Sequence, residues 1–84
     1  MKIDMIKNYI KKLTKEDIVN YLNKEKIEAS IDEINLIYNS IKNDFDYVIH
    51  NDFYKYIERF KSKLNNNLFN KIIEKYNEYK KFIE

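Results

Sequence analysis

Apolar side chains recur every three or four positions along most of the chain. This spacing places them on one face of an α-helix, and no stretch shows the alternation of apolar and polar residues that is typical of a strand. The apolar members of the first stripe are Ile3, Ile6, Tyr9 or Ile10, and Leu13. The pattern therefore predicts an all-α chain that begins with a helix over about residues 2–13.

Two further helix starts are indicated by residues that can cap free backbone N–H groups. Thr14 is followed three residues later by Asp17, and Ser30 is followed three residues later by Glu33. The second pair matches a capping box, in which the two side chains accept hydrogen bonds from each other's backbone N–H. The first pair matches a variant of it, in which the Thr hydroxyl accepts from a backbone N–H and the acid favours the positive end of the helix. The first pair predicts a short helix that ends near Glu25, and the second predicts a longer helix from about residue 31.

The stripe of this third helix continues to about His50, with polar residues Asn43 and Asp44 in its middle. Its apolar members are Ile34, Ile37, Tyr38, Ile41, Phe45, Val48 and Ile49. The sequence leaves open whether the helix is continuous through residues 43–50 or is bent or broken near the Asn-Asp pair.

Asn51 or Asp52 can cap a fourth helix, which the run Asn65-Asn66-Asn67 is expected to end. The apolar stripe of the fourth helix is Phe53, Tyr56, Ile57, Phe60 and Leu64. A final helix is predicted from the stripe Leu68, Phe69, Ile72, Ile73, Tyr76, Tyr79, Phe82 and Ile83. Short connections make neighbouring helices fold back on each other, so we expect a compact antiparallel bundle of four to five short helices that forms a single domain over residues 1–84.

Composition narrows both the turns and the chemistry of this bundle. The 84 residues include no Gly, Pro or Cys. Disulfides, thiolate zinc sites and glycine-rich phosphate loops are therefore excluded, and left-handed helix ends are expected at some of the 12 Asn residues. The first 13 residues lack the uninterrupted apolar run of a signal peptide, and no stretch approaches the roughly 20 apolar residues of a membrane span. We expect a cytoplasmic protein with no membrane association.

The side chains that carry most enzyme chemistry are scarce. His50 is the single histidine, so a metal site would need to combine it with acids such as Asp46 and Asp52. These two acids are already explained as capping residues in a turn between two helices. The hydroxyls of Thr14 and Ser30 are assigned to caps. The sequence therefore predicts no catalytic residue, no metal and no cofactor, and hence a protein that is not an enzyme.

Charge is distributed unevenly, although the net charge is only +2. Residues 1–13 and residues 53–64 each sum to +3, whereas residues 31–52 sum to −4. The two basic segments can therefore meet the acidic segment, either within one molecule or between molecules.

Residues 53–63 combine aromatic with basic side chains. On a helix, Lys55, Arg59 and Lys63 follow each other at intervals of four, which predicts a basic ridge beside an exposed Tyr54. Thirteen aromatic rings exceed what so short a chain can bury. The candidate interaction surface is therefore Tyr54, Lys55, Arg59, Lys63, Tyr76 and Tyr79.

Two functions fit this candidate surface. The first is a helical protein-interaction module that binds a partner protein or a second copy of itself as a homodimer. The alternative is a small nucleic-acid-associated regulatory domain, in which the basic ridge contacts phosphate. The chain has a single arginine, which is poor provision for reading bases and favours the first function.

The caps and stripes also follow one another in a particular order. The matching residues are Leu13, Thr14 and Asp17, then Ile27, Ser30 and Glu33, then Tyr76, Tyr79 and Lys80. Over about residues 13–82 this order resembles a small all-helical domain family of unknown function from low-GC Gram-positive bacteria. The resemblance implies a helical domain without known activity and assigns no functional residue.

Overall fold

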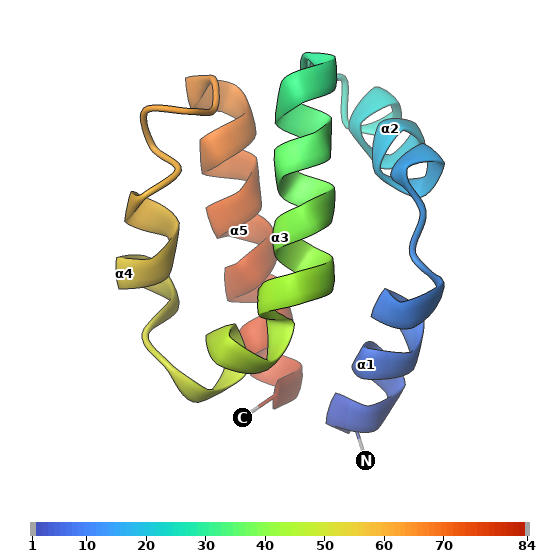
Figure 1. Ribbon diagram of the computed structural model, residues 1–84, viewed down its shortest axis with the longest axis vertical. Coiled ribbons are helices and arrows are strands. Elements are labelled where there is room, and N and C mark those ends of the chain that lie inside the picture. Colours follow the sequence, from blue (N-terminus) through green and yellow to red (C-terminus); the bar gives the residue numbers. More distant parts are fainter. Residues whose placement is uncertain (1, 84) are drawn as a thin grey trace.

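Five helices and no strand form the part of the chain that the structure, a computed structural model, describes (Figure 1). The described part is residues 2–83, with the side chains of residues 4–78, 80 and 81. The helices are α1 (Lys2–Lys12), α2 (Lys15–Lys24), α3 (Ile31–His50), α4 (Phe53–Glu58) and α5 (Asn66–Ile83). The predicted all-α bundle is confirmed.

The helices pack side by side around α3. From α2 onward, successive helices alternate in direction, whereas α1 and α2 run the same way with a bend between them (Figure 1). Helix α3 contacts α1, α2 and α4, and α1 also contacts α5. The radius of gyration is 12.4 Å, close to the roughly 12 Å expected for a compact domain of this length.

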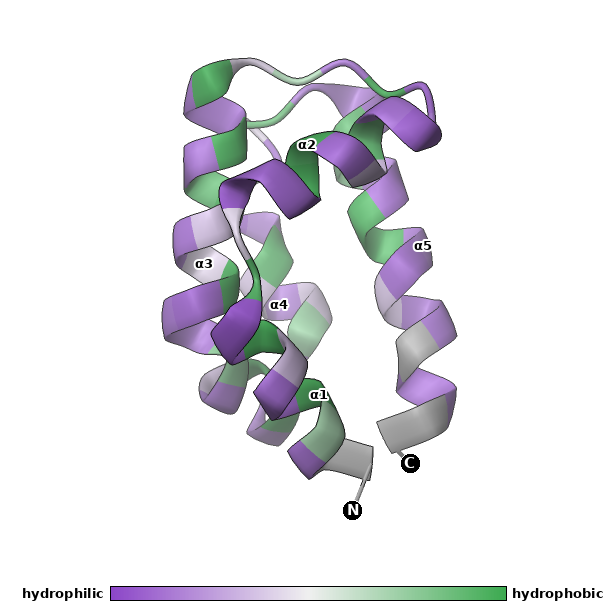
Figure 2. Ribbon diagram, turned by 90° about the vertical axis from the view of Figure 1, so that its right-hand side faces the viewer, coloured by the Kyte–Doolittle hydropathy of each residue, from purple (hydrophilic) through white to green (hydrophobic). Residues whose placement is uncertain are grey.

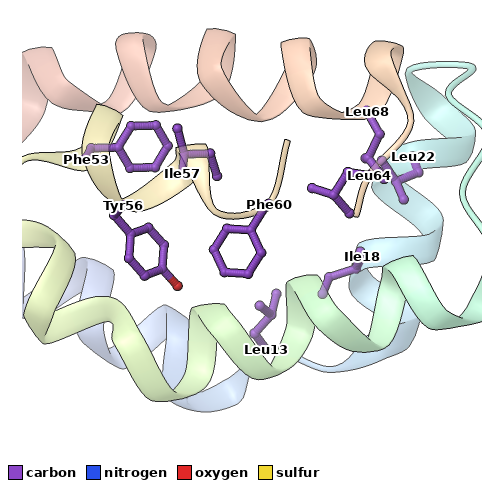
Figure 3. Packing of buried hydrophobic residues seen from close by; sticks show 9 residues of the cluster. All are labelled: Leu13, Ile18, Leu22, Phe53, Tyr56, Ile57, Phe60, Leu64 and Leu68. Carbon is purple, nitrogen blue, oxygen red and sulfur yellow. The ribbon is translucent and has the colours of Figure 1, made fainter. Parts of the chain in front are cut away.

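The core is small and lies between the helices. Its buried members are Leu13, Ile18, Leu22, Phe53, Tyr56, Ile57, Phe60, Leu64 and Leu68 (Figure 3). Leu68 is the most completely buried, with 1% of its surface exposed. None of the nine comes from α3. The apolar residues with which this helix packs against the core are partly buried: Ile34, Leu36, Ile37, Tyr38, Ile41 and Val48.

Apolar and hydrophilic positions are interleaved along each helix, as Figure 2 shows by colour. Among the described residues, no helix is both long and apolar enough to cross a membrane. Of the aromatic residues with described side chains, only Phe53, Tyr56 and Phe60 are buried. The predicted excess of aromatic surface is therefore present.

Both predicted capping boxes form. Thr14 Oγ1 accepts from the Asp17 N–H at 3.1 Å, and Asp17 Oδ2 accepts from the Thr14 N–H at 2.9 Å. The same exchange joins Ser30 and Glu33 at 3.1 and 2.8 Å. Of the two candidates for the fourth cap, Asp52 takes the role, with its Oδ1 accepting from the Tyr54 N–H. Each cap stabilises its helix by about 1 kcal/mol.

Helix α3 is continuous from Ile31 to His50, which resolves the question left at Asn43 and Asp44. The sequence pattern placed Asp46 in a turn between two helices. This prediction is wrong, because Asp46 lies within α3. The side chains of Ile3, Phe82 and Ile83, predicted to face the core, lie outside the described residues.

The predicted extent of the fourth helix is wrong. Helix α4 ends at Glu58, and the chain continues through tight turns in which Phe60 and Lys61 donate to the carbonyl three residues back. Phe60 and Leu64 are nevertheless both buried. The apolar spacing thus predicted which residues face the core, but successive turns satisfy the same spacing as an α-helix.

The final helix begins earlier than predicted, at Asn66. The first residue of the asparagine run is its cap: Asn65 Oδ1 accepts from the Leu68 N–H at 2.8 Å. Asn66 and Asn67 form part of the first turn. A short polar side chain before a helix satisfies free N–H groups. The asparagine run therefore starts α5 as well as separating it from the turns that follow α4.

The end of α2 takes a left-handed residue without Gly or Asn. Lys26 has a φ of 59°, and the Ile27 N–H donates to the Leu22 carbonyl at 2.9 Å while the Lys26 N–H donates to Asn23. These bonds define a Schellman motif. The left-handed conformation costs a lysine roughly 1 kcal/mol, which the burial of Ile27 and Ala29 against the core offsets.

Candidate interaction surface

Helix α4 lies at the edge of the bundle and presents one face to the outside (Figure 1). Phe53, Tyr56 and Ile57 face the core, so the residues between them face outward. Tyr54 is 44% exposed, and Lys55 is exposed beside it. The buried face of the helix thus fixes the direction of the exposed one.

Arg59 and Tyr47 complete this surface on the side nearest α3. The Arg59 guanidinium lies over the Tyr56 ring, 4.9 Å from its centroid. Tyr47, from α3, packs against the same ring with centroids 6.0 Å apart and remains 52% exposed. We call Tyr47, Tyr54, Lys55 and Arg59 the α4 face.

Tyr47 was not predicted as part of this surface. It lies outside the apolar stripe of α3, which marks it as an exposed aromatic residue. Its position beside α4, however, depends on how two helices pack, and no local sequence pattern carries that information.

The two described tyrosines of the predicted surface, Tyr54 and Tyr76, lie together at the α4–α5 contact. Tyr76 stacks on Phe53 with ring centroids 3.8 Å apart and planes 5° from parallel. Tyr54 meets the Tyr76 ring edge-on, and its hydroxyl donates to Asn77 Oδ1 at 2.5 Å. Tyr76 is therefore mainly a packing residue, while Tyr54 is anchored by α5 and still exposed. The side chain of Tyr79 lies outside the described residues.

The predicted basic ridge is not a continuous helical row, because α4 ends at Glu58. Lys63 instead lies with Lys61 in the turns that follow. Both lysines are exposed. We call residues 60–64, with these two lysines, the basic turn.

Four of the five acidic residues of α3 and its end are engaged within the molecule, and the fifth, Asp32, is exposed. Asp46 forms an ion pair with Lys7 of α1 at 3.1 Å, which is the predicted meeting of a basic and an acidic segment. Asp44 accepts from the Tyr56 hydroxyl at 2.5 Å. Asp52 caps α4, and Glu33 caps α3 and also accepts from the Asn65 N–H at 2.7 Å.

These contacts shift the pKa values of Tyr56 and Glu33. Burial, followed by the hydrogen bond to Asp44, raises the pKa of Tyr56 to about 12. The pKa of Glu33 is lowered, mainly because its carboxylate accepts from the Ser30 backbone N–H and also from Asn65.

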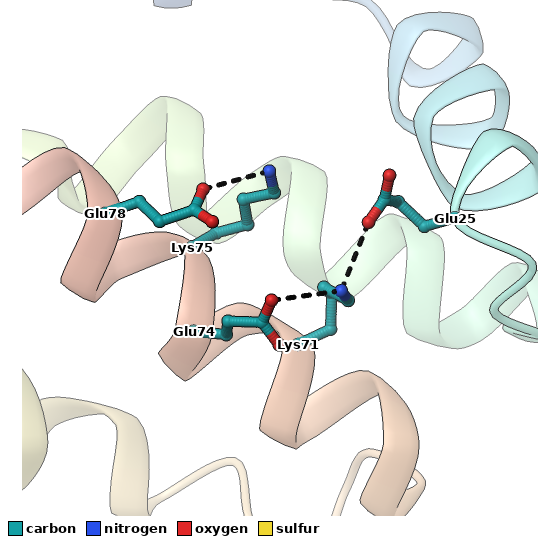
Figure 4. A network of polar contacts seen from close by, with 5 residues as sticks. All are labelled: Glu25, Lys71, Glu74, Lys75 and Glu78. Carbon is teal, nitrogen blue, oxygen red and sulfur yellow. Dashed lines mark hydrogen bonds and ion pairs between the residues drawn. The ribbon is translucent and has the colours of Figure 1, made fainter.

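Lysines of α5 are engaged as well. Lys71 pairs with Glu25, the C-cap of α2, at 3.1 Å and with Glu74 at 3.3 Å, and Lys75 pairs with Glu78 (Figure 4). The hydrogen bond from Lys71 lowers the pKa of Glu25, and the bond to Glu25 raises the pKa of Lys71. This network joins α5 to α2.

The lysines of the α4 face and basic turn differ from these. Within the described part of the chain, Lys55, Lys61 and Lys63 have no carboxylate within ion-pair distance. Glu58 is the single acid among residues 53–64. The edge of the bundle around α4 therefore carries uncompensated positive charge.

A hollow of about 760 Å³ lies at the α2–α3 connection. Its lining includes Ser30, Glu33 and Asn65, whose polar atoms already hydrogen-bond one another. Across the residues whose side chains are described, no three of His, Asp and Glu come together in a group able to hold a metal ion. The polar atoms of these three lining residues are therefore satisfied within the molecule.

Comparisons of the chain with protein-family models, with curated proteins and with solved structures gave no match. The resemblance to the small helical family of low-GC Gram-positive bacteria stays a prediction.

Proposed function

We propose that this chain is a non-enzymatic helical protein-interaction module that binds through the α4 face. The observation that carries the proposal is that exposed aromatic and basic side chains flank α4 on both sides: Tyr47 and Arg59 lie against Tyr56, and Tyr54 lies beside Lys55 and against Tyr76. Tyr and Arg are enriched among residues that contribute most to protein–protein binding. The same proposal places the chain in the cytoplasm and in the small helical family that it resembles. It assigns no cofactor to the module.

Two side chains of the α4 face are held by contacts within the molecule. The Tyr54 hydroxyl is held by Asn77, and the Arg59 guanidinium rests on the Tyr56 ring. Ordering a flexible side chain on binding costs about 0.5–1.5 kcal/mol. Side chains held by packing lose less freedom, so the fixed positions of Tyr54 and Arg59 support a role in binding.

Paired affinity capture tests the proposal. Wild type, Tyr47→Ala and Tyr9→Ala proteins are used as baits in parallel, since Tyr9 on α1 is also exposed and serves as the matched control. We expect a set of proteins retained by wild type and by Tyr9→Ala but lost by Tyr47→Ala. The same set on all three baits would show that the α4 face is not the binding surface.

A second candidate function is nucleic-acid binding, favoured by the absence of ion-pair partners for Lys55, Lys61 and Lys63 within the described residues. Phosphate contacts release counterions, so such binding weakens steeply as salt rises. Fluorescence anisotropy with labelled DNA and RNA at low and high salt tests it. Unchanged anisotropy at low salt would exclude this candidate.

Self-association is the remaining part of the interaction proposal. Sedimentation equilibrium of the wild-type chain over a range of concentrations measures it directly. A strictly monomeric chain at high concentration would exclude the homodimer and leave a different protein as the partner.

A further inference from the structure

We infer that the α4 face and basic turn bind an acidic segment of a different protein, and not a second copy of this chain. The inference rests on the proposed function and adds the chemistry of the partner. It follows from which charges the fold leaves uncompensated.

The positive charge on this edge is concentrated. Lys55, Arg59, Lys61 and Lys63 lie within nine residues and are all exposed. Arg59 faces the Tyr56 ring, and the three lysines have no acid partner among the described residues. A complementary partner surface must therefore supply carboxylates or phosphates.

Among its described residues, a second copy offers only scattered acids to this edge, because the exposed acids without an ion pair or a capping bond lie on different segments of the chain: Asp4, Glu16, Glu28, Asp32 and Glu58. Three of the four acids of its most acidic helix are engaged: Asp44 by Tyr56, Asp46 by Lys7 and Glu33 by Ser30 and Asn65. Further acids that form ion pairs are Glu25, Glu74 and Glu78. A symmetric dimer through this edge would moreover place lysines opposite the same lysines, which is unfavourable.

The dimensions of the surface favour an acidic polypeptide over a nucleic acid. Helix α4 has six residues, so it is only about 9 Å long. Binding to nucleic acid depends on neutralising many phosphates along a track, whereas α4 ends before the basic residues form a row. Two or three carboxylates beside apolar side chains on one partner segment match the lysines and the two tyrosines of the α4 face.

Fluorescence anisotropy provides the test. The probes are a labelled synthetic peptide in which Glu residues alternate with Leu and Phe, and a labelled thymidine oligonucleotide. The test variant is Lys55→Glu/Lys63→Glu, and the control is Lys11→Glu/Lys12→Glu on α1, which changes the net charge equally at two other exposed lysines. We expect the test variant to weaken peptide binding about tenfold or more, and the control to weaken it far less.

Three results would overturn the inference. They are failure of the peptide to bind wild type, equal weakening by both variants, and binding of the oligonucleotide but not of the peptide. Sedimentation adds a fourth: a wild-type dimer that Lys55→Glu/Lys63→Glu alters would identify a second copy as the occupant. In that case Tyr47→Ala would also alter the dimer. The α4 face would then still be the binding surface, but its partner would be a second copy and not an acidic segment of another protein.

Discussion

The junction between α3 and α5 and the edge formed by α4 use polar residues in opposite ways. At the junction, which consists of Ser30, Glu33, Asn65 and Leu68, the polar groups hydrogen-bond one another above a fully buried leucine. On the α4 face and basic turn, lysines face outward with no acid partner among the described residues.

This difference shows that the net charge of a segment does not reveal how it is used. The acidic segment 31–52 and the basic segment 53–64 have charges of similar size. Most of the acids stabilise the fold, whereas most of the bases are left to the surface. Substitutions at the junction should therefore change stability, and substitutions on the basic turn should change binding.

The largest effect is expected from Leu68→Ala. This side chain is 1% exposed, so its truncation leaves a cavity and should lower the free energy of unfolding by about 2–5 kcal/mol. Urea denaturation followed by circular dichroism measures it. The control is Ile31→Ala, at a position that is 77% exposed and should change stability by less than about 0.5 kcal/mol. Equal losses would show that the core does not lie at the junction.

Glu33→Ala should cost about 0.5–2 kcal/mol, because it removes one half of a capping box and the acceptor for the Asn65 N–H. The pKa of Glu33 is lowered from 4.5 in the folded state. Its contribution is therefore present above pH 4.5 and is lost as the pH falls through the folded pKa. The stability difference between wild type and variant should shrink on acidification. Asp32→Ala is the matched control, and a difference independent of pH would contradict the assignment.

Tyr56→Phe tests the border between the two regions, since Tyr56 joins Asp44 of α3 to the α4 face. Loss of its hydrogen bond should cost about 0.5–1.5 kcal/mol. The folded pKa is raised from 10.0 to about 12, so this contribution is complete below pH 10 and is lost as the pH rises toward 12. Absorbance titration should show one late-ionising tyrosine in wild type that is absent from Tyr56→Phe. A variant with the full wild-type titration would refute the assignment.

The smallest effect on stability is expected from Lys61→Ala/Lys63→Ala. Both side chains are exposed and lack ion-pair partners among the described residues, so the free energy of unfolding should change by less than about 0.5 kcal/mol. Binding of the acidic peptide should weaken in the same protein. A clear loss of stability would mean that the basic turn supports the fold, and the contrast between the two regions would disappear.

Local patterns in the sequence predicted the five helices and the starting caps of α2, α3 and α4. A capping box such as Ser30 with Glu33 involves residues three apart, and a stripe such as Phe53, Tyr56 and Ile57 depends only on the geometry of one helix. The same spacing did not show that α4 ends at Glu58, because turns and helix place Phe60 and Leu64 on the same side. The candidate residues Tyr54, Lys55 and Arg59 also came from local spacing.

Tertiary structure decided which of these residues are engaged and which remain available. The pairing of Asp46 with Lys7, the bond from Tyr56 to Asp44 and the position of Tyr47 beside α4 each join residues from different helices. Such contacts depend on how helices pack, which local spacing does not encode. The sequence by itself therefore determined the elements and the amount of charge, and packing alone decided where charge is neutralised and where it faces a partner.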